Sequence, residues 1–461
     1  MSRPTRPSRY WIVAALQGVV GVLREFAHAF RAPAPQEWAA AARGCGLVQA
    51  GESTWTTADD VASTLLVEFR AWNAADDSGE VNMKGTYVTI DSPDIVALTL
   101  SPETSATARA KKRGAREIET GDEDFDADFF VTGPATVARA VLDGETRRLL
   151  SSLRVEVELE MASGTLKGRV PLFSTAARPG PPDPLLPRAL PLMLAAAQRL
   201  ARPAEIPTRL ARNAQSDPQP AVRLHNLMSL VRDYPDDAIL RGALRAGCDD
   251  ASDAVRVRAA IALGEDGRPT LLDVAKCGYA EDGPMARAVA ALGDRISTPD
   301  LQAVLSHALR TRRVEAARSC LHAFGRRADP QGIKALARVL TVEKGELAVA
   351  AAQALAETGE EAAQPLLLGA LAHDRPSLHA ACAEALGRVG TAGAILPLKD
   401  LEKRSRDDAT RRAARQAVAA IQSRLPGASA GQLSLAAADA GALSLAEDET
   451  GRLSLDDDRK P

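Results

Sequence analysis

Aromatic residues are scarce in this sequence: phenylalanine, tryptophan and tyrosine together account for 3% of its 461 residues. Surfaces that bind single-stranded nucleic acid rely on stacked aromatic rings, so a surface of that kind is not expected. The formal net charge is −3 at pH 7. No overall basic field therefore draws the chain to nucleic acid or to an anionic membrane. We expect no nucleic-acid partner.

Motifs that carry chemistry are also missing. The sequence has no Gly-rich phosphate loop before a helix and no HExxH zinc motif. None of the six histidines has a recognisable metal-ligand spacing; they are His28, His225, His307, His322, His373 and His379. We therefore expect no catalytic residue, no cofactor and no metal, and a chain that is not an enzyme.

Cysteines are few and scattered. The five are Cys45, Cys248, Cys277, Cys320 and Cys382, and no two of them form a CxxC pair. Free cysteine behaves as a small hydrophobic residue, so we interpret these as buried, reduced thiols. Reduced thiols are typical of a reducing compartment, which favours a cytoplasmic location.

A repeat with a period near 31 residues fills the second half of the chain. Similar phrases recur, for example VRVRAAIALGEDG (255–267) and SLHAACAEALGRVG (377–390). Their landmark apolar residues follow one another at steps of 29 to 33 residues: Leu230, Leu263, Leu292, Phe324, Leu355, Leu386 and Val418. A fixed period of this length is typical of a solenoid. The pattern predicts seven repeat units over residues 205–425.

Each unit has the signals of two helices. Prolines such as Pro269, Pro299 and Pro330 precede the first apolar segment of a unit, and proline is tolerated in the first helical turn. Glycines follow the landmarks directly, at Gly264, Gly293, Gly325 and Gly387, where we expect left-handed caps at helix ends. Alanine runs allow neighbouring helices to approach closely. Stacked pairs would then bury a continuous core.

The phrase D-x-x-V-R-x-x-A-A-x-A-L-G resembles the HEAT repeat. It is nearly complete at Asp253, Val255, Arg256, Ala259, Ala260, Ala262, Leu263 and Gly264. The short period resembles the phycobilisome-lyase type of HEAT-like repeat, and the whole chain resembles bacterial HEAT-repeat proteins with a similar front domain and tail. This resemblance implies an armadillo-like α-helical solenoid. It leaves the function open among scaffolds, regulators and accessory subunits of lyases.

A different domain precedes the repeats. Residues 33–175 combine a helix at 37–48, strands at 65–72, 86–90, 95–100 and 129–132, one or two helices at 137–153, and a hairpin of 155–161 with 165–173. We predict an α+β domain there. Residues 176–204 are interpreted as a proline-rich linker and a helix (186–201) that caps the solenoid.

A basic segment (109–116) is followed at once by an acidic one, residues 117–128. The acidic spacing does not fit a calcium-binding EF-hand loop. We favour a structural interpretation, in which Phe125 and Phe129 anchor the segment while the carboxylates stay solvated. A site for an ion or a basic partner is the alternative.

The N-terminal segment, residues 1–32, is open to several interpretations. Its apolar run at 10–23 is shorter than the roughly 20 residues that a spanning helix needs. A buried or amphipathic helix, membrane association through residues 10–30, and a cleaved signal remain alternatives.

Recurring cationic residues mark the second helices. They are Arg223, Arg256, Arg287, Arg318, His379 and Arg411. One hypothesis is a stripe that binds an acidic partner. The other is a ladder in which each arginine pairs with an aspartate of the neighbouring unit, with Asp253 as one candidate.

The tail, residues 426–461, holds a second repeat. GQLSL, GALSL and GRLSL recur every ten residues, with leucines at Leu433, Leu435, Leu443, Leu445, Leu453 and Leu455. In an extended segment the two leucines of one copy lie on the same side. The alternatives are a disordered acidic tail and three copies of a docking motif that adds a strand to a partner's sheet.

The sequence as a whole predicts a scaffold or adaptor. It would bind an unidentified protein through the solenoid surface and through the GxLSL tail. An enzyme-accessory role of the chromophore-lyase kind and a membrane-associated adaptor are the alternatives.

Overall fold

A computed structural model describes residues 35–57, 64–75, 81–171, 184–201, 205–373, 375–425, 433–435 and 443–445. The chain divides into two compact units, residues 1–262 and 263–461. The first unit contains the α+β domain and two helix pairs, and the second contains five helix pairs. The predicted fold class, an α+β domain followed by a helical solenoid, is confirmed.

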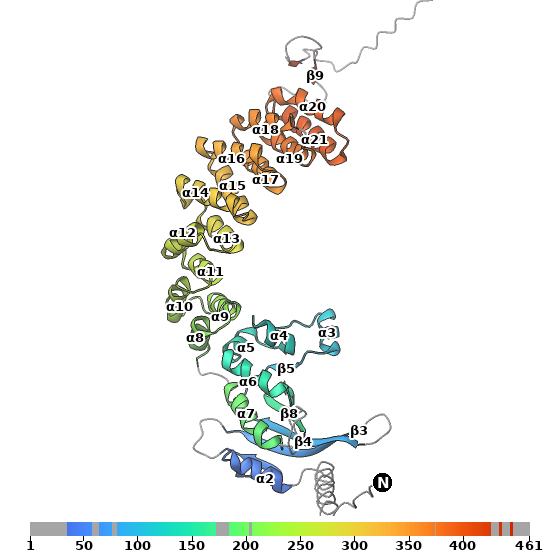
Figure 1. The fold of residues 1–461 in the computed structure, drawn as a ribbon, viewed down its shortest axis with the longest axis vertical. Coiled ribbons are helices and arrows are strands. Elements are labelled where there is room, and N and C mark those ends of the chain that lie inside the picture. The colour runs from blue at the N-terminus through green and yellow to red at the C-terminus, as the bar shows by residue number, and fades with distance from the viewer. Residues whose placement is uncertain are drawn as a thin grey trace, which may run out of the picture. The chain divides into compact units, whose positions relative to one another are not determined.

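The α+β domain has eight strands and six helices among its described residues (Figure 1). In chain order they are α2 (Pro35–Gly44), β1 (Val48–Gln49), β2 (Thr54–Thr56), β3 (Leu66–Ala75), β4 (Val81–Asp91), β5 (Thr99–Pro102), α3 (Ser105–Lys112), α4 (Glu123–Asp128), β6 (Phe129–Thr132), α5 (Ala135–Val141), α6 (Gly144–Arg154), β7 (Glu158–Ala162), β8 (Thr165–Pro171) and α7 (Leu186–Arg199).

The strands form one antiparallel sheet in the order β1-β2-β3-β4-β8-β7-β5-β6. The predicted hairpin is confirmed as β7 and β8, whose turn places Ser163 and Gly164 at positive φ. Two residues with positive φ are typical of the tight hairpin turn that matches strand twist. The expected strand at 95–100 begins only at Thr99, because Ile95 and Val96 bond instead to the end of α7.

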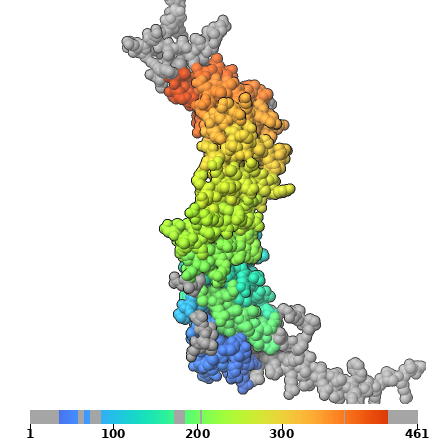
Figure 2. Space-filling model, turned by 90° about the vertical axis from the view of Figure 1, so that its left-hand side faces the viewer, coloured from blue at the N-terminus to red at the C-terminus, as the bar shows by residue number. Residues whose placement is uncertain are grey.

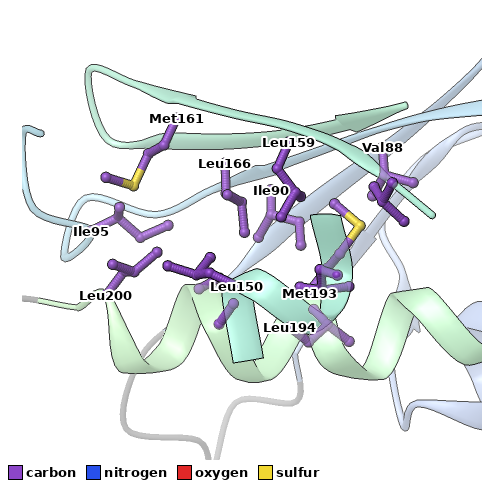
Figure 3. Packing of buried hydrophobic residues seen from close by; sticks show 14 of the residues in the cluster. Val88, Ile90, Ile95, Leu150, Leu159, Met161, Leu166, Met193, Leu194 and Leu200 are labelled. Carbon is purple, nitrogen blue, oxygen red and sulfur yellow. The ribbon is translucent and has the colours of Figure 1, made fainter. Parts of the chain in front are cut away.

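Helix α7 packs under the sheet and completes the core of this domain (Figure 3). Its buried side chains include Leu190 and Met193, which meet Leu166 and Val170 of β8 in the same cluster. Gly168 makes the approach possible, since a Cβ there would lie 2.6 Å from the Met193 Cε. The apolar face of this helix is buried against the sheet, and its expected role as a solenoid cap stays a prediction.

Two helix pairs follow in the first unit. They are α8 (Ile206–Ser216) with α9 (Pro220–Asp233), and α10 (Ala238–Cys248) with α11 (Asp253–Leu263). Helix α5 of the α+β domain packs against both α8 and α9. The first repeat is thus joined to the front domain within one compact unit.

A buried arginine holds this junction together. Arg147 of α6, whose side chain is 2% exposed, donates from Nη1 and Nη2 to the Asp217 carboxylate at 3.0 Å. Its Nε bonds to Asp122 at 2.8 Å, and Nη1 also donates to the Leu142 carbonyl. Burial lowers the pKa of Arg147, but the bonds to the two aspartates outweigh it and raise the pKa.

The polar chain continues into the second helix pair. The Asp217 carbonyl accepts from Arg223 Nη1 at 2.8 Å, and Arg223 forms a two-bond pair with Asp250 at 2.7 Å. Carboxylates and guanidinium groups therefore alternate from Asp122 to Asp250. Each buried charge has a partner, which is the condition under which buried charges are tolerated.

The Gly121 backbone fits closely against α9. Gly121 has φ +96°, and a Cβ there would lie 2.8 Å from the Ala221 carbonyl carbon. The neighbouring Thr120 carbonyl lies 3.1 Å from His225 Nδ1. Only glycine combines this conformation with this contact, so the acidic segment of the sequence forms part of the junction.

The second unit continues the pairs in two rows (Figure 1). Its helices are α12 (Arg268–Lys276), α13 (Asp282–Leu292), α14 (Thr298–Arg310), α15 (Val314–Arg327), α16 (Pro330–Val342), α17 (Glu346–Glu357), α18 (Gln364–Leu371), α19 (Pro376–Val389), α20 (Ile395–Arg404) and α21 (Asp408–Arg424). The second helices, α13 to α21, pack side by side in one row.

The glycines after the landmarks have two different functions. Gly264 and Gly293 both take positive φ at the ends of α11 and α13, although Gly293, with ψ −123°, lies outside the left-handed helical region that was expected. Gly325 and Gly387 lie inside α15 and α19 instead. A Cβ on Gly325 would lie 2.6 Å from the Ala354 carbonyl oxygen, so this glycine is needed for close helix packing.

Two copies of the tail repeat are described. Leu433–Leu435 (β9) and Leu443–Leu445 (β10) pair as antiparallel strands, with Ser434 opposite Ser444. Leu453 and Leu455 of the third copy lie outside the described residues, as does the N-terminal segment 1–32. No helix in the described part of the chain has the length and apolarity to cross a membrane.

Replacing the junction arginine tests its structural role. Arg147→Met leaves the buried Asp217 carboxylate without its cation, and we expect a loss of about 3–5 kcal/mol of stability. Trp38 and Trp55 pack in the core of the front domain, and all four tryptophans precede residue 73, so urea unfolding followed by tryptophan fluorescence reports on the front domain and not on the solenoid.

The control is Arg169→Met, whose ion pair with Glu158 is exposed. It should cost about 0–1 kcal/mol. Equal midpoints for the two variants would contradict the role assigned to Arg147.

Candidate functional site

Arg223 belongs to the structural ladder. It is buried, and it pairs with Asp250 at the start of the loop that follows α10. The partner lies 27 residues further along the chain, in the next helix pair. For this residue the structure supports the ladder hypothesis.

The other predicted cationic residues make contacts within their own repeat unit or are exposed. Arg256 and Arg411 each pair with an aspartate one turn earlier in their own helix, Asp253 and Asp408. His379 Nε2 lies 2.9 Å from the His373 carbonyl oxygen. Arg287 and Arg318 are exposed on α13 and α15. Partner binding by these residues stays a prediction.

A different set of arginines joins neighbouring repeats of the second unit. Each donates to main-chain carbonyl oxygens 31 to 37 residues earlier. The donors are Arg313, Arg327, Arg375, Arg404 and Arg424. Arg375 is the richest case, with bonds to the carbonyls of Leu340, Thr341 and Glu343 at 2.8–3.1 Å. Carbonyls at a helix end lack intrahelical partners, and a guanidinium satisfies several at once.

The acidic segment has a structural function. Phe125 and Phe129 are buried, with ring centroids 4.9 Å apart, as predicted. The carboxylates are not simply solvated, however. Asp126 accepts from the Thr120 hydroxyl and from two backbone amides, while Asp122 pairs with Arg147. Within the described residues no group of three or more potential ligand side chains could hold a metal ion.

A polar pocket of about 370 Å³ lies between α6, α7 and α8. Four arginines line it, Arg148, Arg199, Arg209 and Arg212, and Asp143 lies among them. Asp143 bonds to Arg199 at 2.8 Å and to Arg209 at 3.1 Å. Asp143 therefore already pairs with two of the pocket's four arginines.

A basic groove of about 630 Å³ lies between α20 and α21. Its seven lining residues are all charged: Lys399, Glu402, Lys403, Asp408, Arg411, Arg412 and Arg415. Five cations and two anions give a net charge of +3. This groove can attract an acidic partner, but it offers no aliphatic side chain to bury.

A second groove, of about 660 Å³, lies between α14 and α16. These first helices belong to the face turned to the viewer in Figure 2, where they are yellow to orange. The α14 side chains follow one stripe, Gln302, Leu305, Ser306, Leu309 and Arg310, and those of α16 follow another, Gln331, Lys334, Ala335, Arg338, Val339, Val342 and Glu343. We call this the α14/α16 groove.

The α14/α16 groove combines apolar and cationic surfaces. Leu305 and Val339 are 4% and 2% exposed and form the floor, while Val342 is 65% exposed at one end. Arg310, Lys334 and Arg338 supply three positive charges and Glu343 one negative charge, a net of +2. Sequence reasoning missed this groove because it followed the second helices. The signal was the spacing of four residues between Lys334 and Arg338, which places both cations on one face of α16.

Three of the five thiols, Cys248, Cys320 and Cys382, are buried as expected, whereas Cys45 and Cys277 are only partly buried. Burial raises the pKa of Cys320 and Cys382 to about 12, which keeps both thiols protonated.

One short match to a hydrolase motif does occur: Gly-Ala-Ser-Ala-Gly at 427–431 has the form G-x-S-x-G. In hydrolases this motif lies between a strand and a helix. Here it follows α21 and lies outside the described residues.

The family model of HEAT repeats matches residues 343–419, which include helices α17 to α20 and most of α21. The chain therefore carries HEAT repeats. A solved structure, human deoxyhypusine hydroxylase in complex with glycerol, is 18% identical and covers 47% of this chain and 96% of its own, with a TM-score of 0.21. No curated protein matches the sequence.

The inter-repeat arginines are testable through Arg375. Arg375→Ala removes three bonds to the C-terminal carbonyls of α16, and we expect a loss of about 1–3 kcal/mol. Hydrogen exchange should quicken at the end of α16 and at the start of α19. Arg318→Ala, an exposed arginine on α15, should change stability by less than about 0.5 kcal/mol. Equal exchange rates in the two variants would contradict the role that we assign to Arg375 in joining neighbouring repeats.

The junction should weaken in acid. Burial raises the pKa of Asp143, but bonds from Arg199 and Thr146 outweigh it and hold the pKa below its usual value. Arg232 and Thr136 lower the pKa of Asp233 to about 2. These carboxylates stabilise the fold fully above the unfolded pKa of about 4. Their contribution is lost as the pH falls towards 2.

Thermal unfolding of the tryptophan signal between pH 5 and 2 tests this. The wild-type midpoint should fall across this range. Asp143→Asn should start lower and depend less on pH, because that position no longer titrates. An Asp143→Asn variant with the full wild-type slope would show that Asp143 does not contribute.

Proposed function

We propose that this chain is a non-catalytic HEAT-repeat scaffold whose α14/α16 groove binds an acidic, leucine-containing segment of a partner protein. The observation that carries the proposal is the pairing of a buried aliphatic floor with a cationic rim on two adjacent helices. Binding sites are typically concave and mostly apolar, with a few placed polar groups.

The floor and the rim favour different parts of a ligand. Leu305, Leu309, Ala335 and Val339 accept aliphatic side chains, and burying one leucine contributes about 1.5–3 kcal/mol before ordering costs. Arg310, Lys334 and Arg338 attract carboxylates and reject basic segments. The two requirements together select a segment in which leucine and acidic residues alternate or lie next to each other.

The α20/α21 groove supports the same role in a different way. Its net charge of +3 favours acidic partners, and such charge mainly speeds association. Because all its lining side chains are charged, its contribution should fall steeply with salt. We propose that the α20/α21 groove speeds the approach of the acidic partner and that the α14/α16 groove holds the partner once it has bound.

Two finer hypotheses remain distinct from this proposal. A phycobilisome-lyase type of repeat implies an accessory role in which a small chromophore binds. Membrane association through residues 10–30 implies a cytoplasmic adaptor that is held at a membrane. The peptide experiment distinguishes the scaffold from the chromophore-binding accessory role. Fractionation of the intact protein tests the membrane association.

A labelled 12-residue peptide of alternating leucine and glutamate tests the groove by fluorescence anisotropy. It is titrated into the full chain and into a full-length variant with Leu453→Ser and Leu455→Ser, because the tail itself carries leucines beside acidic residues. In either background, Arg338→Glu and Val342→Asp should each weaken binding about fivefold or more, near 1 kcal/mol. A peptide with serine in place of leucine should lose most of its affinity.

The control is Arg388→Glu, an exposed charge reversal on α19. It should leave the affinity within about twofold. The proposal fails if the peptide binds neither chain, or if Arg388→Glu weakens binding as much as Arg338→Glu does.

A further inference from the structure

We propose that the third GxLSL segment of this chain's own tail, residues 453–458, docks in the α14/α16 groove and competes there with the partner. This rests on the proposed function, since it assigns an internal ligand to the same groove. The segment reads Leu-Ser-Leu-Asp-Asp-Asp.

The chemistry of the segment matches the groove. In an extended backbone Leu453 and Leu455 project to the same side, with the serine between them on the other. Two leucines fit the floor of Leu305, Leu309 and Val339. Three carboxylates follow at once, and the rim of the groove presents three cations against one anion. Within residues 453–458 charge and hydrophobicity therefore agree, and Arg452, Arg459 and Lys460 flank the segment.

The third copy differs from the first two in its surroundings. The first copy is followed by Ala-Ala-Ala-Asp-Ala, which has one carboxylate, and the second by Ala-Glu-Asp-Glu-Thr, whose three carboxylates are separated from the last leucine by one alanine. In the third copy three aspartates follow the last leucine directly. The first two copies also pair with each other as β9 and β10, in register from Leu433 opposite Leu445 to Leu435 opposite Leu443. Their main-chain groups are therefore engaged with each other.

The tail is long enough to reach the groove. Leu453 follows Leu425 by 28 residues, which extend to about 90 Å at most. Helices α16, α18 and α20 are successive members of one row, and packed helices lie about 8–10 Å apart. The strands β9 and β10 use part of this length, but the remainder still spans the two helix-to-helix distances from α20 to α16.

The α20/α21 groove is a poorer site for this segment, although it is more basic. All of its lining residues are charged, so the leucines would contact only the aliphatic stems of lysine and arginine side chains. The carboxylates would supply most of the attraction there, through exposed ion pairs worth about 0–1 kcal/mol each. Because the α14/α16 groove has an aliphatic floor for the two leucines, we assign the segment to that groove.

Tethering gives this ligand an advantage over a free one. A segment on a short linker has an effective concentration in the millimolar range. The apparent affinity of a partner falls in proportion to the fraction of grooves left free. If the tail fills nine grooves in ten, removing it should raise the affinity of a competing peptide about tenfold. A partner must therefore bind tightly enough to displace the tail from the groove.

Photo-crosslinking of the full chain tests the docking. Leu455 is replaced by p-benzoylphenylalanine, the protein is irradiated, and the crosslinked peptides are mapped by mass spectrometry. We expect products of monomer mass that join the tail to residues 302–310 and 331–343. Lys334→Glu with Arg338→Glu should remove these products, whereas Arg258→Glu with Arg388→Glu, two exposed charge reversals outside the grooves, should keep them.

The peptide titration supplies the second readout. Leu453→Ser with Leu455→Ser should raise the affinity for the leucine–glutamate peptide about tenfold. The matched substitutions in the first copy, Leu433→Ser with Leu435→Ser, should leave it unchanged. Substitutions in the tail leave the helices intact, so a failure to fold does not confuse the result.

Several outcomes would overturn the docking proposal. Crosslinks of dimer mass would assign the groove to the tail of a second copy, and crosslinks to residues 399–415 would assign the tail to the basic groove. Equal peptide affinity with and without the leucines would also overturn it, while leaving the proposed function in place. A peptide that binds neither chain would instead reject the proposed function itself.

Discussion

The structure of the first unit depends on a charged group that is removed from water. Arg147 would be costly to bury alone, since an isolated ion in a protein interior loses several kcal/mol of hydration. Asp122 and Asp217 compensate for that loss from opposite sides, one in the α+β domain and one after the first solenoid helix. The arginine is therefore stable only when both parts are in place. That requirement joins the α+β domain to the first repeats.

Arginine has two functions in the solenoid. Some arginines are structural, because they donate to carbonyl oxygens one repeat earlier, as Arg375 does at the end of α16. Others, such as Arg338 and Arg412, line open grooves. Helix ends need donors for their carbonyls, and binding surfaces need cations that remain accessible. The same residue type meets both needs, which explains why arginine content alone does not identify a binding surface.

The grooves lie where the repeat itself leaves space. Second helices pack against one another along the array, so their small residues are used for stacking. The first helices α14 and α16 have fewer such constraints, and an aliphatic floor with a cationic rim forms between them. A solenoid can vary such surface residues without changing its core. A scaffold that binds leucine-rich acidic segments fits this division, and the tail of the same chain has the matching chemistry.

The sequence by itself determined the repeat architecture. The spacing of Leu230 to Val418 predicted seven helix pairs, and all seven are present among the described residues, because helical periodicity and capping signals act over a few neighbouring residues. Phe125 and Phe129 were likewise predictable as anchors. The tertiary structure alone decided which charges are structural. The partners of Arg147 lie 25 and 70 residues away, and those of Arg375 lie 32 to 35 residues away. It also placed α7 under the sheet and brought the side chains of α14 and α16 together. Such contacts join residues that are distant along the chain, and local patterns contain no information about which distant residues will meet.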